Sequence, residues 1–64
     1  MPNSKADRVL IAYFERPAKE YVQTLKSIKA AGGLTSDEVA EIRAQAPAVH
    51  ADAILRHLSE PVVN

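Results

Sequence analysis

The two histidines, His50 and His57, are the first candidates for chemistry, and they lie seven residues apart in the second half of the chain. On a helix this spacing puts both imidazoles on one side, but about 10.5 Å apart along the axis. Two histidines that hold one zinc ion on a helix are four residues apart. The chain also has no cysteine that could complete such a site. We therefore expect surface or interface histidines, no metal site and no cofactor.

The carboxylates and hydroxyls do not form a better catalytic set. Asp37, Glu38 and Glu41 gather at the start of an expected helix, whereas a catalytic pair needs an environment that separates the two pKa values. No Ser or Thr lies at a spacing from a His or Lys that indicates an activated nucleophile. A short helical chain also has little volume for an enclosed pocket. We therefore predict that the protein is not an enzyme and has no catalytic residue.

The elements that position these residues are expected to be helices, because apolar residues recur at spacings of three and four along the chain. The sequence predicts an all-α fold, a small bundle of three to four short helices in a single domain of residues 1–64. Its first half spans 4–31, its second half 35–60, and a flexible tail 61–64. The Pro-Ala pairs at 17–18 and 47–48 indicate two similar helix-proline-helix halves.

The joint between the halves has the clearest local signals. The Gly-Gly pair at 32–33 accepts the positive φ with which many helices end. Thr35 and Glu38 have the spacing of a capping box, in which each side chain bonds the backbone N–H of the other residue. We expect one helix to end near Ala31 and the next to begin near Ser36, as antiparallel neighbours joined by this short turn.

Pro17 allows two interpretations, and the same holds for Pro47. A proline inside a helix removes a hydrogen bond and clashes with the preceding turn, at a cost of about 3 kcal/mol, but it is tolerated in the first turn of a new helix. Either two helices meet at Arg16, or a single kinked helix runs from Ser4 to Ala31. The second interpretation stays open because the apolar stripe continues in phase across the proline.

The first expected helix has a wider apolar arc than one core contact needs, since the residues from Val9 to Phe14 cover roughly 200° of its circumference. A chain of this length buries only about 60 % of the surface that its unfolded form exposes. We therefore expect a second molecule to cover part of the arc. The predicted partner-binding surface combines an apolar set with a basic set beside it: Val9, Leu10, Tyr13 and Phe14, with Arg16, Lys19 and Lys26.

Charge is distributed unevenly although the net charge is zero. Residues 1–32 carry six basic and three acidic side chains, and residues 33–64 carry two basic and five acidic ones. The halves could attract each other within one fold or head-to-tail between two chains, or one half could present a charged face to a partner. A net charge of zero argues against attraction of the whole protein to DNA or anionic lipid.

These observations predict a small cytoplasmic interaction protein, a regulator or inhibitor that docks on a larger protein as a homodimer. The alternative is a nucleic-acid-binding transcriptional regulator that uses the basic helix face or a helix-turn-helix in residues 35–58. Nucleic acid is a possible but not a favoured partner, because Asp52 lies where the second helix would read bases. No apolar run approaches the roughly 20 residues of a membrane span, so no membrane partner is expected.

Overall fold

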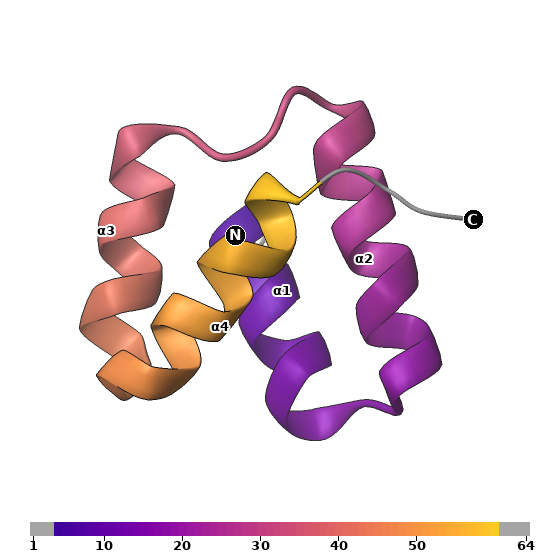
Figure 1. Cartoon of the computed structure of the whole chain (residues 1–64), viewed down its shortest axis with the longest axis horizontal. Helices are drawn as coiled ribbons and strands as arrows, with labels where there is room; N and C mark the ends of the chain where they lie inside the picture. The colour runs from indigo at the N-terminus through magenta and orange to yellow at the C-terminus, as the bar shows by residue number, and fades with distance from the viewer. Residues whose placement is uncertain (1–3, 61–64) are drawn as a thin grey trace.

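Four α-helices surround a small apolar core in a computed structural model, which describes residues 4–60. They are α1 (Lys5–Glu15), α2 (Ala18–Ala30), α3 (Ser36–Gln45) and α4 (Ala48–Ser59). Both α1 and α4 pack against α2 and α3, so that α2 and α3 lie on opposite sides of the bundle (Figure 1). The predicted all-α fold is confirmed. The tail predicted at 61–64 lies outside the described residues.

Pro17 and Pro47 each separate two helices, so the interpretation with a break is confirmed at both positions. The residues before them have extended backbones, with φ −119° and ψ 160° at Arg16 and φ −117° and ψ 149° at Ala46. This follows from the clash between the proline ring and the preceding residue, which disfavours the α region there. Each proline is then the N-cap of the next helix. Both halves therefore have the helix-proline-helix form that the repeated Pro-Ala pair indicates.

The glycine pair closes α2 as expected. Gly32 and Gly33 have φ values of 100° and 84°, and the Gly33 N–H donates to the Ile28 carbonyl at 2.9 Å. The prediction that α2 and α3 are antiparallel neighbours is wrong, because α1 and α4 lie between them (Figure 1). The connection instead crosses one end of the bundle, where the Lys5 ammonium at the start of α1 donates to the Gly33 carbonyl at 3.1 Å.

The predicted capping box at the start of α3 is present. The Thr35 hydroxyl accepts from the Glu38 N–H at 3.2 Å, and the Glu38 carboxylate accepts from the Thr35 N–H at 2.9 Å. The bond from the Thr35 N–H is the main reason that the pKa of Glu38 lies below its ordinary value. Because the folded state favours the carboxylate, its stabilising effect is lost when acid protonates Glu38.

We predict that Thr35→Ala lowers the free energy of unfolding by about 1 kcal/mol, because it removes the N-cap acceptor of α3. Chemical denaturation measures this difference. The control is Ser36→Ala, at the next position on the same exposed turn, which should change the free energy much less. Equal effects of the two substitutions would contradict a specific cap at Thr35.

The core lies where the four helices meet. The side chains of Val9, Ile42 and Ile54 have no exposed surface. Smaller or less completely covered apolar residues surround them: Ala6, Leu10, Leu25, Ile28, Ala46 and Ala51. No polar side chain within residues 4–60 is fully buried. Apolar burial therefore holds the helices together, and polar contacts lie at the edge of the core.

Candidate functional site

Val9 and Leu10 lie mainly in the core, so the structure offers little of either predicted contact residue to a partner. Val9 is completely buried and Leu10 is 8 % exposed. The reason is that α1 is covered by α2 on one side and by α3 on the other. Helices α2 and α3 therefore cover most of the wide apolar arc of α1. No second molecule is needed to cover Val9 and Leu10.

Tyr13 belongs to a cluster that links the two halves, which we call the tyrosine-histidine cluster: Tyr13, Tyr21, His50 and His57. The Tyr13 hydroxyl lies 2.9 Å from Nδ1 of His50, and the Tyr21 hydroxyl lies 2.8 Å from Nδ1 of His57. The rings of the two tyrosines contact edge to face, with centroids 5.3 Å apart. The histidines, which the sequence predicts at a surface or an interface, are half-buried and bonded within the chain.

The tyrosine-histidine cluster has the chemistry of a structural link. A tyrosine donates to Nδ1 only when that nitrogen carries no proton, which is the case in a neutral imidazole with its N–H at Nε2. Burial, with a smaller contribution from the nearby Tyr13, raises the pKa of Tyr21 to about 12. Tyr21 therefore keeps its proton at neutral pH, whereas a tyrosine that acts as a base or nucleophile needs a lowered pKa.

The raised pKa of Tyr21 predicts a loss of stability in alkali. Below its ordinary pKa of 10.0 the Tyr21 hydroxyl is protonated in both the folded and the unfolded chain. Between that value and about 12 the unfolded chain releases the proton and the folded chain retains it, so the free energy of unfolding falls as the pH rises. Denaturation at about pH 9 and about pH 11 measures this fall, which should be smaller for Tyr21→Phe than for the parent chain. An equal fall in the free energy of unfolding for the two chains would contradict the raised pKa of Tyr21.

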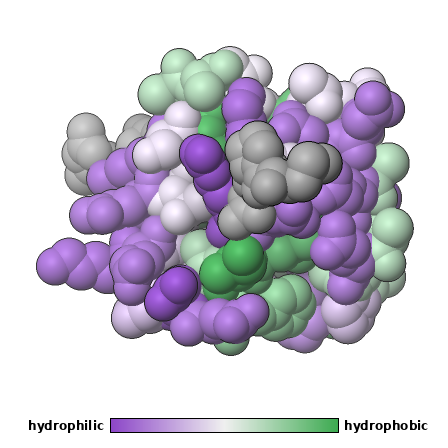
Figure 2. Space-filling view, turned by 180° about the vertical axis from the view of Figure 1, so that it is seen from behind, coloured by the Kyte–Doolittle hydropathy of each residue, from purple (hydrophilic) through white to green (hydrophobic). Residues whose placement is uncertain are grey.

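Phe14 alone among the four predicted apolar contact residues is exposed, with half of its side chain accessible. Its ring contacts Tyr13 and His50 from outside, with centroids 4.9 and 5.5 Å away. Together with Leu10 and Ile11 it lines a hollow of about 380 Å³ between α1 and α3. Figure 2 shows a hydrophobic patch on this side of the molecule, over α1 and framed by hydrophilic side chains.

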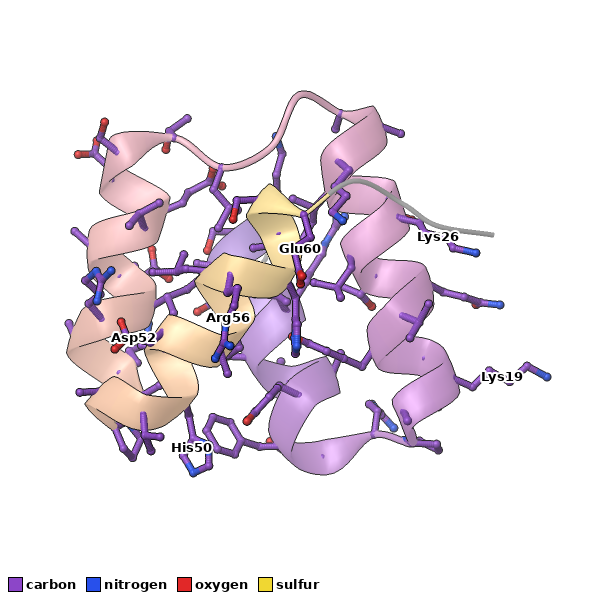
Figure 3. All side chains as sticks on the ribbon, in the orientation of Figure 1. Lys19, Lys26, His50, Asp52, Arg56 and Glu60 are labelled. Carbon is purple, nitrogen blue, oxygen red and sulfur yellow. The ribbon has the colours of Figure 1, made fainter. Side chains whose placement is uncertain are left out.

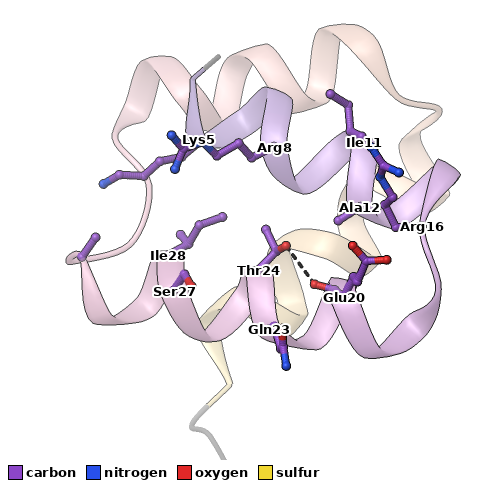
Figure 4. A pocket seen from close by; sticks show the side chains of 11 residues that line it. Lys5, Arg8, Ile11, Ala12, Arg16, Glu20, Gln23, Thr24, Ser27 and Ile28 are labelled. Carbon is purple, nitrogen blue, oxygen red and sulfur yellow. Dashed lines mark hydrogen bonds between the residues drawn. The ribbon is translucent and has the colours of Figure 1, made fainter. Parts of the chain in front are cut away.

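A second hollow, a groove of about 490 Å³, lies on the other side of α1, against α2 (Figure 4). Its floor includes the buried Ala12 and Ile28. The small side chains of Thr24 and Ser27 on α2 leave it open. The Thr24 hydroxyl is already used, because it donates to the backbone carbonyl of Glu20 at 2.8 Å. The groove therefore offers an apolar floor and a polar rim.

Ile11 lines both hollows and so forms a ridge between them. We call this ridge, with Phe14 and the two hollows, the α1 face. Sequence reasoning did not select Ile11, although an apolar residue that lies off the main stripe of an amphipathic helix is a signal for an exposed contact. On the α1 face an exposed aromatic ring, an apolar ridge and charged rims occur together.

The predicted basic residues are exposed, but the structure does not bring them all to the α1 face. Arg16 lines the groove between α1 and α2. Lys19 and Lys26 extend from the outer side of α2, away from the bundle (Figure 3), and neither lines either hollow. The predicted surface therefore divides into the α1 face, which includes Arg16, and a separate basic side of α2.

Opposite charges of the two halves do not pair with each other within the described residues. Among residues 4–60 the single ion pair joins Arg43 and Asp52 at 2.9 Å, and both belong to the second half. The attraction that the sequence suggests between the two halves therefore produces no ion pair among residues 4–60. Lys5 and Lys29 donate to backbone carbonyls of the chain, whereas Arg8, Arg16, Lys19 and Lys26 take part in no ion pair within residues 4–60.

The helices of the proposed helix-turn-helix are present as α3 and α4, joined by Ala46-Pro47. The first turns of α4 would have to read bases in this arrangement. Asp52 is exposed there, and its carboxylate accepts a hydrogen bond from the Arg43 guanidinium at 2.9 Å. This surface of α4 does not favour nucleic acid.

Comparisons with protein-family models, with curated protein sequences and with solved structures give no match to this chain. Within the described residues, no three His, Cys, Asp or Glu side chains are grouped so that they could hold a metal ion. None of the described helices has the length and apolar character of a membrane span. Function is therefore inferred from the surfaces of the chain itself.

Proposed function

We propose that this chain is a non-catalytic protein-interaction module that docks through the α1 face. It regulates or inhibits a larger protein by occupying a surface of it, in the cytoplasm and as a homodimer. The observation that carries the proposal is the exposure of Phe14, an aromatic ring held in place by Tyr13 and His50 beside the Ile11 ridge. Aromatic residues of this kind are enriched among the residues that dominate binding energy in interfaces.

Basic residues on the rim of the α1 face and on the separate outer side of α2 support the same role. Arg16 lies on its rim, and Lys19 and Lys26 give the outer side of α2 a basic character (Figure 3). Such lysines would steer an acidic protein toward the module and raise the association rate more than the final affinity. We therefore propose that the larger partner carries an acidic surface.

Replacing Phe14 with Asp tests the docking role. We expect Phe14→Asp to abolish capture of protein partners while its helical circular dichroism stays close to that of the parent chain. The matched control is Val22→Asp, because Val22 is another exposed apolar residue, 45 % accessible compared with 50 % for Phe14. The control should retain capture. Equal capture by both variants, or loss of helicity in Phe14→Asp alone, would contradict docking through this ring.

A further inference from the structure

The groove between α1 and α2 has cations at both ends of an apolar floor. Lys5 and Arg8 lie at one end and Arg16 at the other (Figure 4). Ala12 is four residues after Arg8 and four before Arg16, so the two arginines flank it along one side of α1, about 12 Å apart along the helix axis. The groove therefore presents an apolar surface that is bounded along its length by positive charge.

The charge of the groove is positive overall. Its described lining has three cations and one carboxylate, Glu20, which lies at the same end as Arg16 (Figure 4). Glu15 precedes Arg16 in the chain and adds a second carboxylate beside that end. The end with Lys5 and Arg8 has no carboxylate among the described residues that line it. An acidic group is therefore attracted most strongly at this end and more weakly beside Arg16.

The shape of the groove favours a segment of another protein over a small molecule. Small-molecule sites bury most of their ligand, whereas this groove lies open along the surface between two helices (Figure 4). Thr24 and Ser27 line its α2 side, and their short side chains leave room for the backbone of a partner. An amphipathic helix in such a groove presents residues spaced by three, four and seven on one face. That face matches the groove when an apolar residue stands between two acidic ones.

We propose that this groove binds an acidic amphipathic helix of the larger protein. One carboxylate of that helix lies against Arg8, an apolar side chain one turn later covers Ala12, and a second carboxylate lies near Arg16. Acidic residues seven or eight positions apart on a helix are separated by roughly 10.5 to 12 Å, which matches the spacing of the two arginines. The inference rests on the proposed docking role of the α1 face. It names the segment that fills one hollow, while Phe14, beyond the Ile11 ridge, contacts another part of the same protein.

Nucleic acid fits the groove less well than an acidic helix. Phosphates also bind arginine and lysine, but a row of phosphates along the groove would meet the carboxylate of Glu20. The net charge of the chain is zero, so no general attraction of the whole protein to nucleic acid compensates for this repulsion. The apolar floor is better covered by an apolar side chain than by a phosphate.

A synthetic helical peptide tests the groove directly. The probe is a fluorescent, alanine-rich peptide with one leucine flanked on the same helix face by two glutamates, and the control peptide has glutamines in place of the glutamates. Fluorescence anisotropy with the full chain measures the binding of each peptide. We expect the glutamate peptide to bind about tenfold more tightly or better, because only its carboxylates are attracted to the arginines. Equal binding of the two peptides would overturn the proposal.

Arg8→Glu and Lys19→Glu show where the peptide binds. Both replace one exposed cation by a carboxylate, so they change the net charge equally, but Lys19 lines neither hollow. We expect Arg8→Glu to weaken binding of the glutamate peptide about tenfold or more, and Lys19→Glu to weaken it much less. Equal weakening by the two variants would mean that charge attracts the peptide without a defined site, and would overturn the proposal. Circular dichroism checks that both variants are helical.

Ser27→Phe places a bulky side chain in the groove without changing its charge. Its matched control is Ala30→Phe, at another exposed position of α2 that lines neither hollow. We expect Ser27→Phe to abolish binding of the glutamate peptide and Ala30→Phe to retain it. Retained binding in Ser27→Phe would refute the groove as the site.

Nuclear magnetic resonance of the parent chain locates the bound peptide without any substitution. We expect the largest shift changes at the backbone amides of Ala12, Thr24 and Ile28, which line the groove. Largest changes at Lys19 and Lys26 would place the peptide on the outer side of α2 and overturn the proposal. Tighter binding of a duplex DNA oligonucleotide than of the glutamate peptide at the same amides would favour nucleic acid and also overturn it.

Failure of the groove site and failure of the docking role give different results. If Phe14→Asp loses capture of the larger protein and Ser27→Phe keeps it, the docking role stands and the groove site is refuted. If the glutamate peptide binds in the groove while Phe14→Asp captures as much protein as the parent chain, the groove site stands and docking through the Phe14 ring is refuted.

Discussion

Replacing Val9 with Asp is expected to unfold the protein. Val9 has no exposed surface and lies among apolar residues of the core, and an uncompensated carboxylate at such a site belongs to the rare substitutions that cost more than about 4 kcal/mol. A domain of this size has a total stability of only about 3–5 kcal/mol. Far-UV circular dichroism should therefore show loss of most helical signal.

The matched control for Val9→Asp is Phe14→Asp, which places the same charge on the same helix but at an exposed position. This variant should remain helical. The contrast separates the core side of α1 from its docking side. A helical Val9→Asp variant that has lost only partner binding would instead restore Val9 as a contact residue, as the sequence predicts.

Truncating Ile42 to Ala is expected to lower the free energy of unfolding by about 2–5 kcal/mol, because it removes buried methyl groups and leaves a cavity. Ile42 is completely buried on α3 and is one of the largest buried side chains. Urea denaturation measures the difference, with added stabilising osmolyte if the variant is largely unfolded without denaturant.

Val49→Ala is the control for Ile42→Ala, because Val49 has 71 % of its side chain exposed. Its removal should change the free energy of unfolding by less than about 0.5 kcal/mol. In the sequence both residues belong, with Ala46, to one series of apolar residues spaced by four and three. A comparable effect of the two truncations would mean that α4 is oriented differently in the bundle.

Helix boundaries could be predicted from sequence because they depend on nearby residues. The capping box at Thr35 and Glu38 forms as expected, and Ser4 caps α1 through the Asp7 N–H. The breaks at Pro17 and Pro47 follow from ring sterics alone. Each of these signals acts over at most four residues, so tertiary contacts do not override it.

The faces of the helices were harder to predict, because a break changes the direction of the chain. Val49 is seven residues after Ile42 and would share its face on one continuous helix. Pro47 ends α3 and starts α4 in a new direction, so Ile42 is buried and Val49 is exposed. The order of packing, with α2 and α3 apart, also depends on contacts between residues far apart in sequence.

The candidate site was predicted only in part for the same reason. The aromatic character of Phe14 and the charge of Arg16 are visible in the sequence, and both are exposed. Burial of Val9 and Leu10 depends on cover by α2 and α3, which periodicity does not reveal. The bonds from Tyr13 to His50 and from Tyr21 to His57 span 37 and 36 residues and have no local signal.

The mass of the chain in solution tests most directly whether the proposed module is a homodimer. Light scattering at increasing concentration, up to about 1 mM because small interfaces are weak, should show the mass rising from 7.0 kDa toward twice that value. Because salt screens exposed charges, high salt should shift the rise to higher concentration. A parent chain that keeps the mass of one copy at every concentration and salt would contradict the proposed homodimer.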